Sequence, residues 1–343
     1  MLKDISVSFS PHISQRLSTR TVMLDVVIGL APAMAAAGYY FRLRAVILIA
    51  ACVIASVAAE WVCNAIRKKA CSLGDFSAVV TGIILALSLP PKLPVWTAVI
   101  GSVFAIAIGK MVFGGLGSNI FNPAMVGRTF LAVSFGTLMT TWTVPATIDP
   151  NMSGISAGNI LIEGASEWRT QATPLAWSKM AIKNKLGADT YSKDEFVGTI
   201  TGEVGGCLGE TSAIALLIGG AYLLIRKTIS FHIPAAVLVS ALAFGAIAYL
   251  TDSMAYVQPF YHLTSGGLLL CALFIATDPV TAPLTRRGMW IFGVGVGGLT
   301  MLIRIAGGYP EGVMFSVLIM NAVTPLIDRL CKRVPAGGKP SVT

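Results

Sequence analysis

The sequence predicts an all-α integral membrane protein with about ten transmembrane helices, arranged as two inverted five-helix repeats that contain short broken helices. Of the 343 residues, 55% are hydrophobic and only 12% are charged, and the mean hydropathy is +0.76. A soluble domain carries about 25% charged residues, so most of this surface is expected to face lipid. Lipid offers the backbone no hydrogen-bond partner, which leaves helices or a closed barrel. The apolar runs are continuous rather than alternating, and this favours helices.

Ten apolar segments account for the predicted spans. They cover residues 21–41, 45–66, 76–90, 93–113, 121–138, 211–225, 232–250, 264–277, 288–303 and 312–328. A full crossing needs about 20 residues, so the third and eighth segments are short. The third ends at Pro90-Pro91 and the eighth at Asp278-Pro279. Short, proline-terminated segments at corresponding places in two halves indicate a central site between repeats, although proline also ends helices that have no such role.

Basic residues are distributed unevenly between the two sides of the predicted bundle. The short loops of one side hold only Arg42, Arg44, Lys92 and Arg304, whereas the side with both chain ends holds Lys3, Arg16, Arg20, Arg67, Lys68, Lys69, Lys110, Arg226, Lys227, Arg286, Arg287, Arg329, Lys332, Arg333 and Lys339. An excess of lysine and arginine marks the cytoplasmic side. We therefore expect both termini in the cytoplasm. The expected organisation is a cytoplasmic segment 1–20, a first repeat 21–138, an extracytoplasmic loop 139–210, a second repeat 211–328 and a cytoplasmic tail 329–343.

Several other signals are excluded. The net charge of +9 does not indicate nucleic-acid binding, because the basic residues lie in short clusters between apolar runs, as topology signals do. No cleavable signal peptide is expected, because the first twenty residues lack an apolar stretch. The six cysteines have no C-x-x-C spacing, so no metal site is expected. Gly293, Gly295 and Gly298 match a dinucleotide fingerprint, but without a preceding strand they indicate close helix packing, as does Gly293-x-x-x-Gly297.

The hydrophilic loop contains the first candidate site, Thr170-Gln171-Ala172-Thr173-Pro174-Leu175. Apolar residues then recur at helical spacing, which places Thr173 at an N-cap with Pro174 in the first helical position. One interpretation is a threonine that only caps a surface helix. The other is a phosphate ester on Thr173, because free N–H groups and the positive dipole end of a helix suit a phosphate.

Charged residues in or near the spans form a second group of candidates, because an unpaired charge in lipid is costly. They are Asp25, Glu60, Lys110, Arg128, Asp278 and Arg304. We expect Asp278 to cap a half-helix, and Arg128 to pair with a bound group or an acidic neighbour. Lys110 and Arg304 are expected to extend towards the membrane interface.

Five motifs in order along the chain carry a resemblance to a known family. They are Ser10-Pro11-His12-Ile13, Leu89-Pro90-Pro91, the segment Asn119–Gly127, Ala276-Thr277-Asp278-Pro279-Val280 and the segment Gly312–Asn321. Their order and spacing between residues 9 and 330 resemble the D subunits of the Rnf ion-translocating electron-transport complexes. The sister family is the B subunit of the sodium-pumping NADH:quinone reductase.

The resemblance implies that Thr173 carries FMN through a phosphoester made by a dedicated flavin transferase. In the sister family the motif reads small-Gly-Ala-Thr. Here Ala172 and Thr173 match, Thr170 supplies a small hydroxyl residue, and Gln171 replaces the glycine.

The sister family also has an Asn-x-x-Asn-Pro segment beside a non-covalent riboflavin, which Asn119 and Asn122 resemble. Two amides three residues apart would share one helix face and could meet the pyrimidine edge of a flavin, with Arg128 nearby. The alternative is that both asparagines cap a helix broken at Pro123.

By this resemblance the chain would be one subunit of a translocase in a bacterial inner membrane, with no catalytic residue and no activity of its own. Its partners would be lipid and the A, B, C, E and G subunits, and electrons would arrive from the FMN-bearing G subunit. Electron flow between ferredoxin and NAD would move Na⁺ or H⁺. The alternatives are a flavin-free permease or channel, which inverted halves with broken helices also describe, and a quinone-reductase B subunit.

Overall fold

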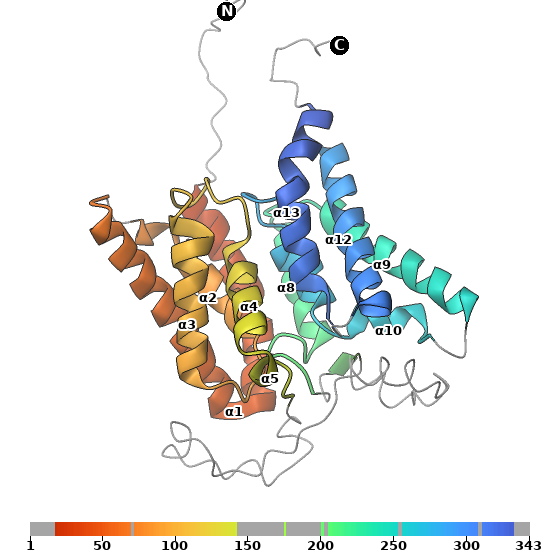
Figure 1. The fold of residues 1–343 in the computed structure, drawn as a ribbon, viewed down its shortest axis with the longest axis horizontal. Helices are drawn as coiled ribbons and strands as arrows, with labels where there is room; N and C mark the ends of the chain where they lie inside the picture. Colours follow the sequence, from red (N-terminus) through yellow and green to blue (C-terminus); the bar gives the residue numbers. More distant parts are fainter. Residues whose placement is uncertain are drawn as a thin grey trace, which may run out of the picture.

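The computed structural model describes residues 18–69, 72–142, 175, 200–201, 205–252, 256–307 and 311–332. In these ranges every regular element is a helix (Figure 1). Four helices are long and apolar enough to cross a membrane, and three further apolar helices are shorter. The expectation of an all-helical membrane protein is therefore confirmed, and all ten predicted segments contain helix. The division into two inverted repeats stays a prediction.

The first two predicted spans form one element, α1 (Thr19–Ile66), which is broken at Arg42. The Ser18 side chain caps its start by accepting a hydrogen bond from the Thr21 amide. Arg42 has φ 54°, in the left-handed region that a non-glycine residue adopts at a cost. The neighbouring Arg44 donates hydrogen bonds to the carbonyl oxygens of Pro91 and Leu93 at 3.2 and 2.9 Å. These bonds fasten the break to the segment that connects residues 77–87 with residues 95–106.

The rest of the first half surrounds a short central helix. The elements are η1 (Leu73–Asp75), α2 (Ser77–Leu87), α3 (Val95–Ile106), the π-helical turn η2 (Ala107–Met111), α4 (Pro123–Ser134) and α5 (Gly136–Met139). Almost every residue of α2 is buried. Because α2 contacts α1, α3 and α4, its short length is compatible with the membrane interior, where backbone ends are tolerated when protein surrounds them.

The second half contains α8 (Ala213–Ile225), α9 (His232–Thr251), α12 (Arg286–Ala306) and α13 (Val313–Leu330). Its eighth predicted segment is broken into α10 (Pro259–Thr264), α11 (Leu268–Leu270) and a second π-helical turn, η6 (Cys271–Ile275). All residues of α11 and η6 are buried. The prediction of short helices is thus confirmed at both places, and a break within the segment is found at the eighth.

Gly293 and Gly297 of α12 pack against α9, as the sequence predicted. A Cβ added at Gly293 would lie 2.5 Å from Ala236 Cβ, and one at Gly297 would lie 2.0 Å from Ser240 Oγ. The two backbones therefore approach so closely that only glycine fits. The helix-packing interpretation of these glycines is confirmed.

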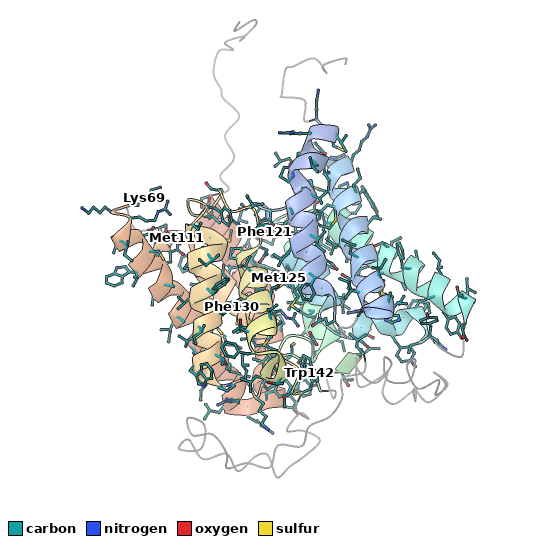
Figure 2. The ribbon with its side chains drawn as sticks, viewed as in Figure 1. Lys69, Met111, Phe121, Met125, Phe130 and Trp142 are labelled. Atoms are coloured by element: carbon teal, nitrogen blue, oxygen red, sulfur yellow. The ribbon has the colours of Figure 1, made fainter. Side chains whose placement is uncertain are left out.

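The two halves lie side by side and meet where α1 contacts α8 and α4 contacts α13 (Figure 1). The start of α1 and the end of α13 lie at one end of the bundle, and α5 lies at the other. Figure 2 places Lys69 at the first end and Trp142, where the described first part of the hydrophilic loop stops, at the opposite end. This arrangement is the one that the basic residues predict, whereas the assignment of the first end to the cytoplasm stays a prediction.

Candidate functional site

A pocket of about 690 Å³, part of it open to solvent, lies between the two halves. Its walls come from α1, α2, α4, α8 and η6 together with the segments that join them. Apolar side chains such as Ile84, Leu223 and Phe274 line much of it, and Asn119, Asn122 and Thr228 are among the polar groups. An apolar pocket with a few polar groups suits an organic ligand.

The two asparagines reach this pocket by a different local structure from the one predicted. Asn122 is the N-cap of α4: its Oδ1 accepts hydrogen bonds from the amides of Ala124 and Met125, with Pro123 as the first helical residue. Asn119 lies before the helix, so the prediction that the two amides share a helix face is wrong. The capping alternative is correct for Asn122, because a cap gives the free N–H groups at the helix start an acceptor.

The remaining polar atoms of the two asparagines differ in one respect. Asn122 Nδ2 donates to the Ile275 carbonyl oxygen at 3.3 Å and so ties α4 to η6. Asn119 Nδ2 donates to the Phe121 carbonyl oxygen at 3.1 Å, but Asn119 Oδ1 is buried and has no hydrogen-bond partner among the described residues. A buried acceptor without a donor is costly, so Asn119 Oδ1 has the chemistry to accept a hydrogen bond from a ligand in the pocket.

One acidic residue, Asp278, lines the pocket, and a second, Asp25, binds the pocket residue Thr228. Asp278 accepts hydrogen bonds from the Val280 amide at 3.4 Å and from Thr281 Oγ1 at 3.1 Å. It stabilises a turn, and the next helix, α12, starts only at Arg286. The prediction that Asp278 caps a half-helix is therefore wrong. Asp25 on α1 also accepts hydrogen bonds from two residues of the end of α8, Tyr222 and Arg226.

Lys110 does not extend towards the membrane interface. It lies in the π-helical turn η2, is 1% exposed, and donates hydrogen bonds to both carboxylate oxygens of Glu60 at 2.8 Å. Glu60 is fully buried and also accepts a hydrogen bond from Ser72 Oγ. Lys110 further contacts Ser77 Oγ at 2.5 Å. The prediction failed because a buried lysine is stable when two carboxylate oxygens and one hydroxyl group satisfy its three donors.

Arg304 is also buried rather than extended. Its guanidinium donates hydrogen bonds to the carbonyl oxygens of His262 at 2.6 Å and Ser265 at 3.0 Å. It therefore supports the broken segment between α10 and α11, whose carbonyl groups have no partner in a regular helix. The interfacial prediction for Arg304 is wrong for this reason.

Arg128 pairs with acidic neighbours, one of the two expectations for it. Its Nη2 contacts Glu311 and lies 3.7 Å from Glu210 Oε1. Glu210 and Glu311 could not be recognised as its partners from sequence patterns alone, because both lie at the edges of predicted spans, where charged residues are common. The signal that could have found them is charge balance: a span arginine needs a carboxylate, and both glutamates directly precede a predicted span.

The predicted flavin-attachment motif, Thr170, Gln171, Ala172 and Thr173, lies outside the described residues. Leu175, two residues further on, is described and is buried. A Cβ added at Gly266 would lie 2.6 Å from Leu175 Cδ1, so the Leu175 side chain packs on the Gly266 turn.

The described helices and the pocket between the two halves define a helical membrane protein. Residues 6–337 match the NQR2, RnfD, RnfE family. The chain is 43% identical to the D subunit of the Na⁺-translocating ferredoxin:NAD⁺ oxidoreductase complex of Acetobacterium woodii, over 96% of this chain and 94% of that protein. It is 40% identical to the D subunit of the proton-translocating ferredoxin:NAD⁺ oxidoreductase complex of Clostridium ljungdahlii, over 97% and 96%.

A third relative extends the comparison. The chain is 40% identical to the D subunit of the ion-translocating oxidoreductase complex of Stutzerimonas stutzeri, over 95% of this chain and 96% of that protein. The family match and the three relatives each cover almost the whole length of this chain. The chain therefore belongs to the NQR2, RnfD, RnfE family.

Proposed function

We propose that this chain is the D subunit of an Rnf-type complex, which couples electron transfer between ferredoxin and NAD⁺ to the movement of Na⁺ or H⁺ across a bacterial inner membrane. The observation that carries the proposal is the match to D subunits over at least 95% of this chain in each case. The A, B, C, E and G subunits are the proposed partners. One similar D subunit belongs to a Na⁺ and another to a proton pump, so either ion fits.

The proposed electron carrier is FMN, joined through its phosphate to Thr173 by a flavin transferase. Family membership supports this attachment, and so does the predicted N-cap position of Thr173 before Pro174, because a helix start stabilises a phosphate. Leu175, two residues after Thr173 in the sequence, packs on the Gly266 turn. FMN supplies the redox chemistry, and the protein holds and orients it.

A non-covalent riboflavin is the proposed occupant of the pocket between the halves. Asn119 Oδ1 is a buried acceptor without a protein partner, and the imide N–H of a flavin ring is a donor of the kind it needs. The largely apolar walls, including Phe274 and Leu223, suit the dimethylbenzene part of the ring.

Thr173→Ala is expected to abolish covalent flavin attachment completely. The measurement is flavin fluorescence of the band on a denaturing gel, together with the intact mass of the full-length protein. The wild type should fluoresce and carry the mass of one FMN phosphoester. Thr190→Ala, in the same predicted loop but outside the motif, is the matched control and should keep the flavin. A dark wild-type band would contradict the assignment of a flavin carrier and favour a permease.

Asn119→Ala is expected to weaken riboflavin binding by about 10- to 100-fold, because one hydrogen bond to a buried group is lost. The measurement is the amount of free flavin released when the purified protein is denatured. Asn321→Ala is the matched control, since Asn321 is also a buried asparagine with unpartnered side-chain atoms but does not line the pocket. Equal riboflavin in Asn119→Ala and the wild type would contradict the proposed site.

A further inference from the structure

A buried pair of carboxyl groups lies away from the pocket, beside the Gly266 turn. Glu210 precedes α8 and Glu311 precedes α13, so both lie outside the long apolar helices. Together with Cys207, each offers one ligand atom within 4.8 Å of the others. Arg128 reaches this pair from α4. The contact of Arg128 with the pair thus links the first half of the protein to the second.

The two carboxyl groups have different partners. Glu311 is fully bound: Oε2 contacts the Arg128 guanidinium, and Oε1 accepts a hydrogen bond from the Gly267 amide at 2.7 Å. Among the described residues, Glu210 accepts only a long hydrogen bond of 3.4 Å from the Cys207 amide, on Oε2. Glu210 Oε1 is buried, has no hydrogen-bond partner in the described part of the chain and lies 3.7 Å from Arg128 Nη2. A buried carboxylate oxygen without a donor is costly, and a proton removes that cost.

The charged side chains around the two glutamates also favour a proton on one of the carboxyl groups. The second arginine of the region, Arg304 on α12, gives hydrogen bonds to the carbonyl oxygens of His262 and Ser265. Arg128 is therefore the one cation in direct contact with the carboxyl groups among the described residues. In direct contact, one arginine faces two glutamates, so a single proton on one carboxyl group balances the contacting charges. Arg304 acts on the pair from further away.

We propose that Glu210 and Glu311 form a proton-binding site in which Glu210 holds one proton and Glu311 stays ionised against Arg128. Binding is a simple addition of H⁺ to the Glu210 carboxylate, and release restores the carboxylate. The site is independent of the flavin assignments above. It lies beside the Gly266 turn on which Leu175 packs.

The neighbouring groups agree with this assignment. Burial and then the charge of Glu311 raise the pKa of Glu210 to about 8, although Arg128 acts against them. Burial also opposes ionisation of Glu311, but Arg128, the nearby Glu210 carboxyl group and Arg304 outweigh it and lower its pKa. The other titratable groups around the pair are Cys207, Cys271 on η6 and His262 on α10.

A metal ion fits this group of residues less well than a proton. Glu210 and Glu311 with the Cys207 thiol would be the ligands. However, the Arg128 guanidinium already contacts Glu311 and lies within hydrogen-bond distance of Cys207 Sγ, at 3.5 Å. A cation among these ligands would have to displace a fixed positive charge at a large electrostatic cost.

The glycine turn at residues 266–267 explains why the two carboxyl groups can lie so close together. A Cβ added at Gly267 would lie 2.6 Å from Glu311 Oε1 and 3.3 Å from Glu210 Oε1, and Gly266 has φ +71°. Any side chain at position 267 would push the carboxyl groups apart. The turn therefore brings a backbone donor to Glu311 while leaving Glu210 without one.

The test is pH-dependent infrared difference spectroscopy of the full-length protein in lipid nanodiscs. The wild type should show the C=O stretch of a protonated carboxyl group that disappears as the pH rises through about 8. Glu210→Gln should abolish this band. Glu311→Gln should abolish it at neutral pH as well, because Glu210 then becomes the partner of Arg128 and ionises. Asp328→Asn, a partly exposed carboxyl group on α13, is the control and should keep the band.

Thermal stability gives a second readout. The native pKa of Glu210 lies above its ordinary value of 4.5, so the native state binds the proton more tightly than the unfolded chain. The stabilisation that the Glu210 proton contributes is complete below about pH 4.5 and is lost as the pH rises through about 8. The melting temperature of the wild type should therefore decrease over this range more than that of Glu210→Gln.

Two results would overturn the proposal. One is a wild-type spectrum without a titrating carboxyl band. The other is a band that persists in folded Glu210→Gln. If Glu210→Gln does not fold, the wild-type spectrum and Glu311→Gln still decide the question. Covalent flavin fluorescence is recorded on the same samples, so failure of the flavin assignment is recognised separately.

Discussion

Lys110→Met is expected to destabilise the protein by about 3–5 kcal/mol, because it leaves the fully buried Glu60 without its cation. Methionine fills a similar volume, so packing is nearly preserved and the loss is mainly electrostatic. The measurement is the melting temperature and the yield of folded protein in nanodiscs. Glu60 keeps its hydrogen bond from Ser72, which is itself bound by Asn64, but neutral hydroxyl groups replace only part of the lost charge interaction.

The double variant Lys110→Met with Glu60→Leu distinguishes this cause from a packing defect. Removal of both charges should recover much of the stability, because replacing a buried ion pair by apolar residues is often neutral. Lys92→Met makes the same substitution at an exposed lysine and should change stability by no more than about 0.5 kcal/mol. A double variant that is less stable than Lys110→Met would show that the charge was not the cause.

Gly219→Ala is expected to have the second large effect, because it separates the two halves. A Cβ at Gly219 would lie 1.9 Å from the Gly29 carbonyl oxygen on α1 and 3.0 Å from Phe274 Cζ. Backbone atoms cannot move aside as a flexible side chain can, so α1 and α8 must move apart. Overpacking costs about 1–3 kcal/mol. Because Phe274 and the neighbouring Leu223 line the pocket, riboflavin should be lost as well.

The control for this variant is Gly38→Ala, also at a glycine within a helix. A Cβ at Gly38 would meet only Val46 Cγ2, at 4.0 Å. Alanine should be neutral or slightly stabilising there, since glycine costs about 0.5–1 kcal/mol in a helix interior. Melting temperature and bound flavin are measured on both variants. A Gly219→Ala protein with wild-type values of both would contradict the close contact of α1 and α8.

The helical architecture could be predicted from the sequence because the signal is local. The signals are continuous apolar runs, basic clusters and the prolines after the third and eighth segments. Each of them lies within a few residues of the helix end that it marks. The π-helical turns η2 and η6 could not be predicted, because they arise where buried segments meet neighbours that are distant in the sequence.

The side-chain predictions failed where partners are far apart along the chain. Lys110 pairs with Glu60, fifty residues away, and Arg304 binds carbonyl groups that are free only because the eighth segment is broken. Arg128 was correctly expected to find an acidic neighbour, but neither Glu210 nor Glu311 was chosen from the sequence. Asn119 and Asn122 line one pocket, although the conformation predicted for them was wrong.

The break in α1 has a consequence for how the protein withstands degradation. Most connections between membrane helices offer proteases an extended, accessible stretch of chain. Here the first two spans are joined through a single left-handed residue, Arg42, and Arg44 fastens the bend to Pro91 and Leu93. A peptidase needs several residues in an open strand-like form, and this bend provides none without unwinding helix on both sides.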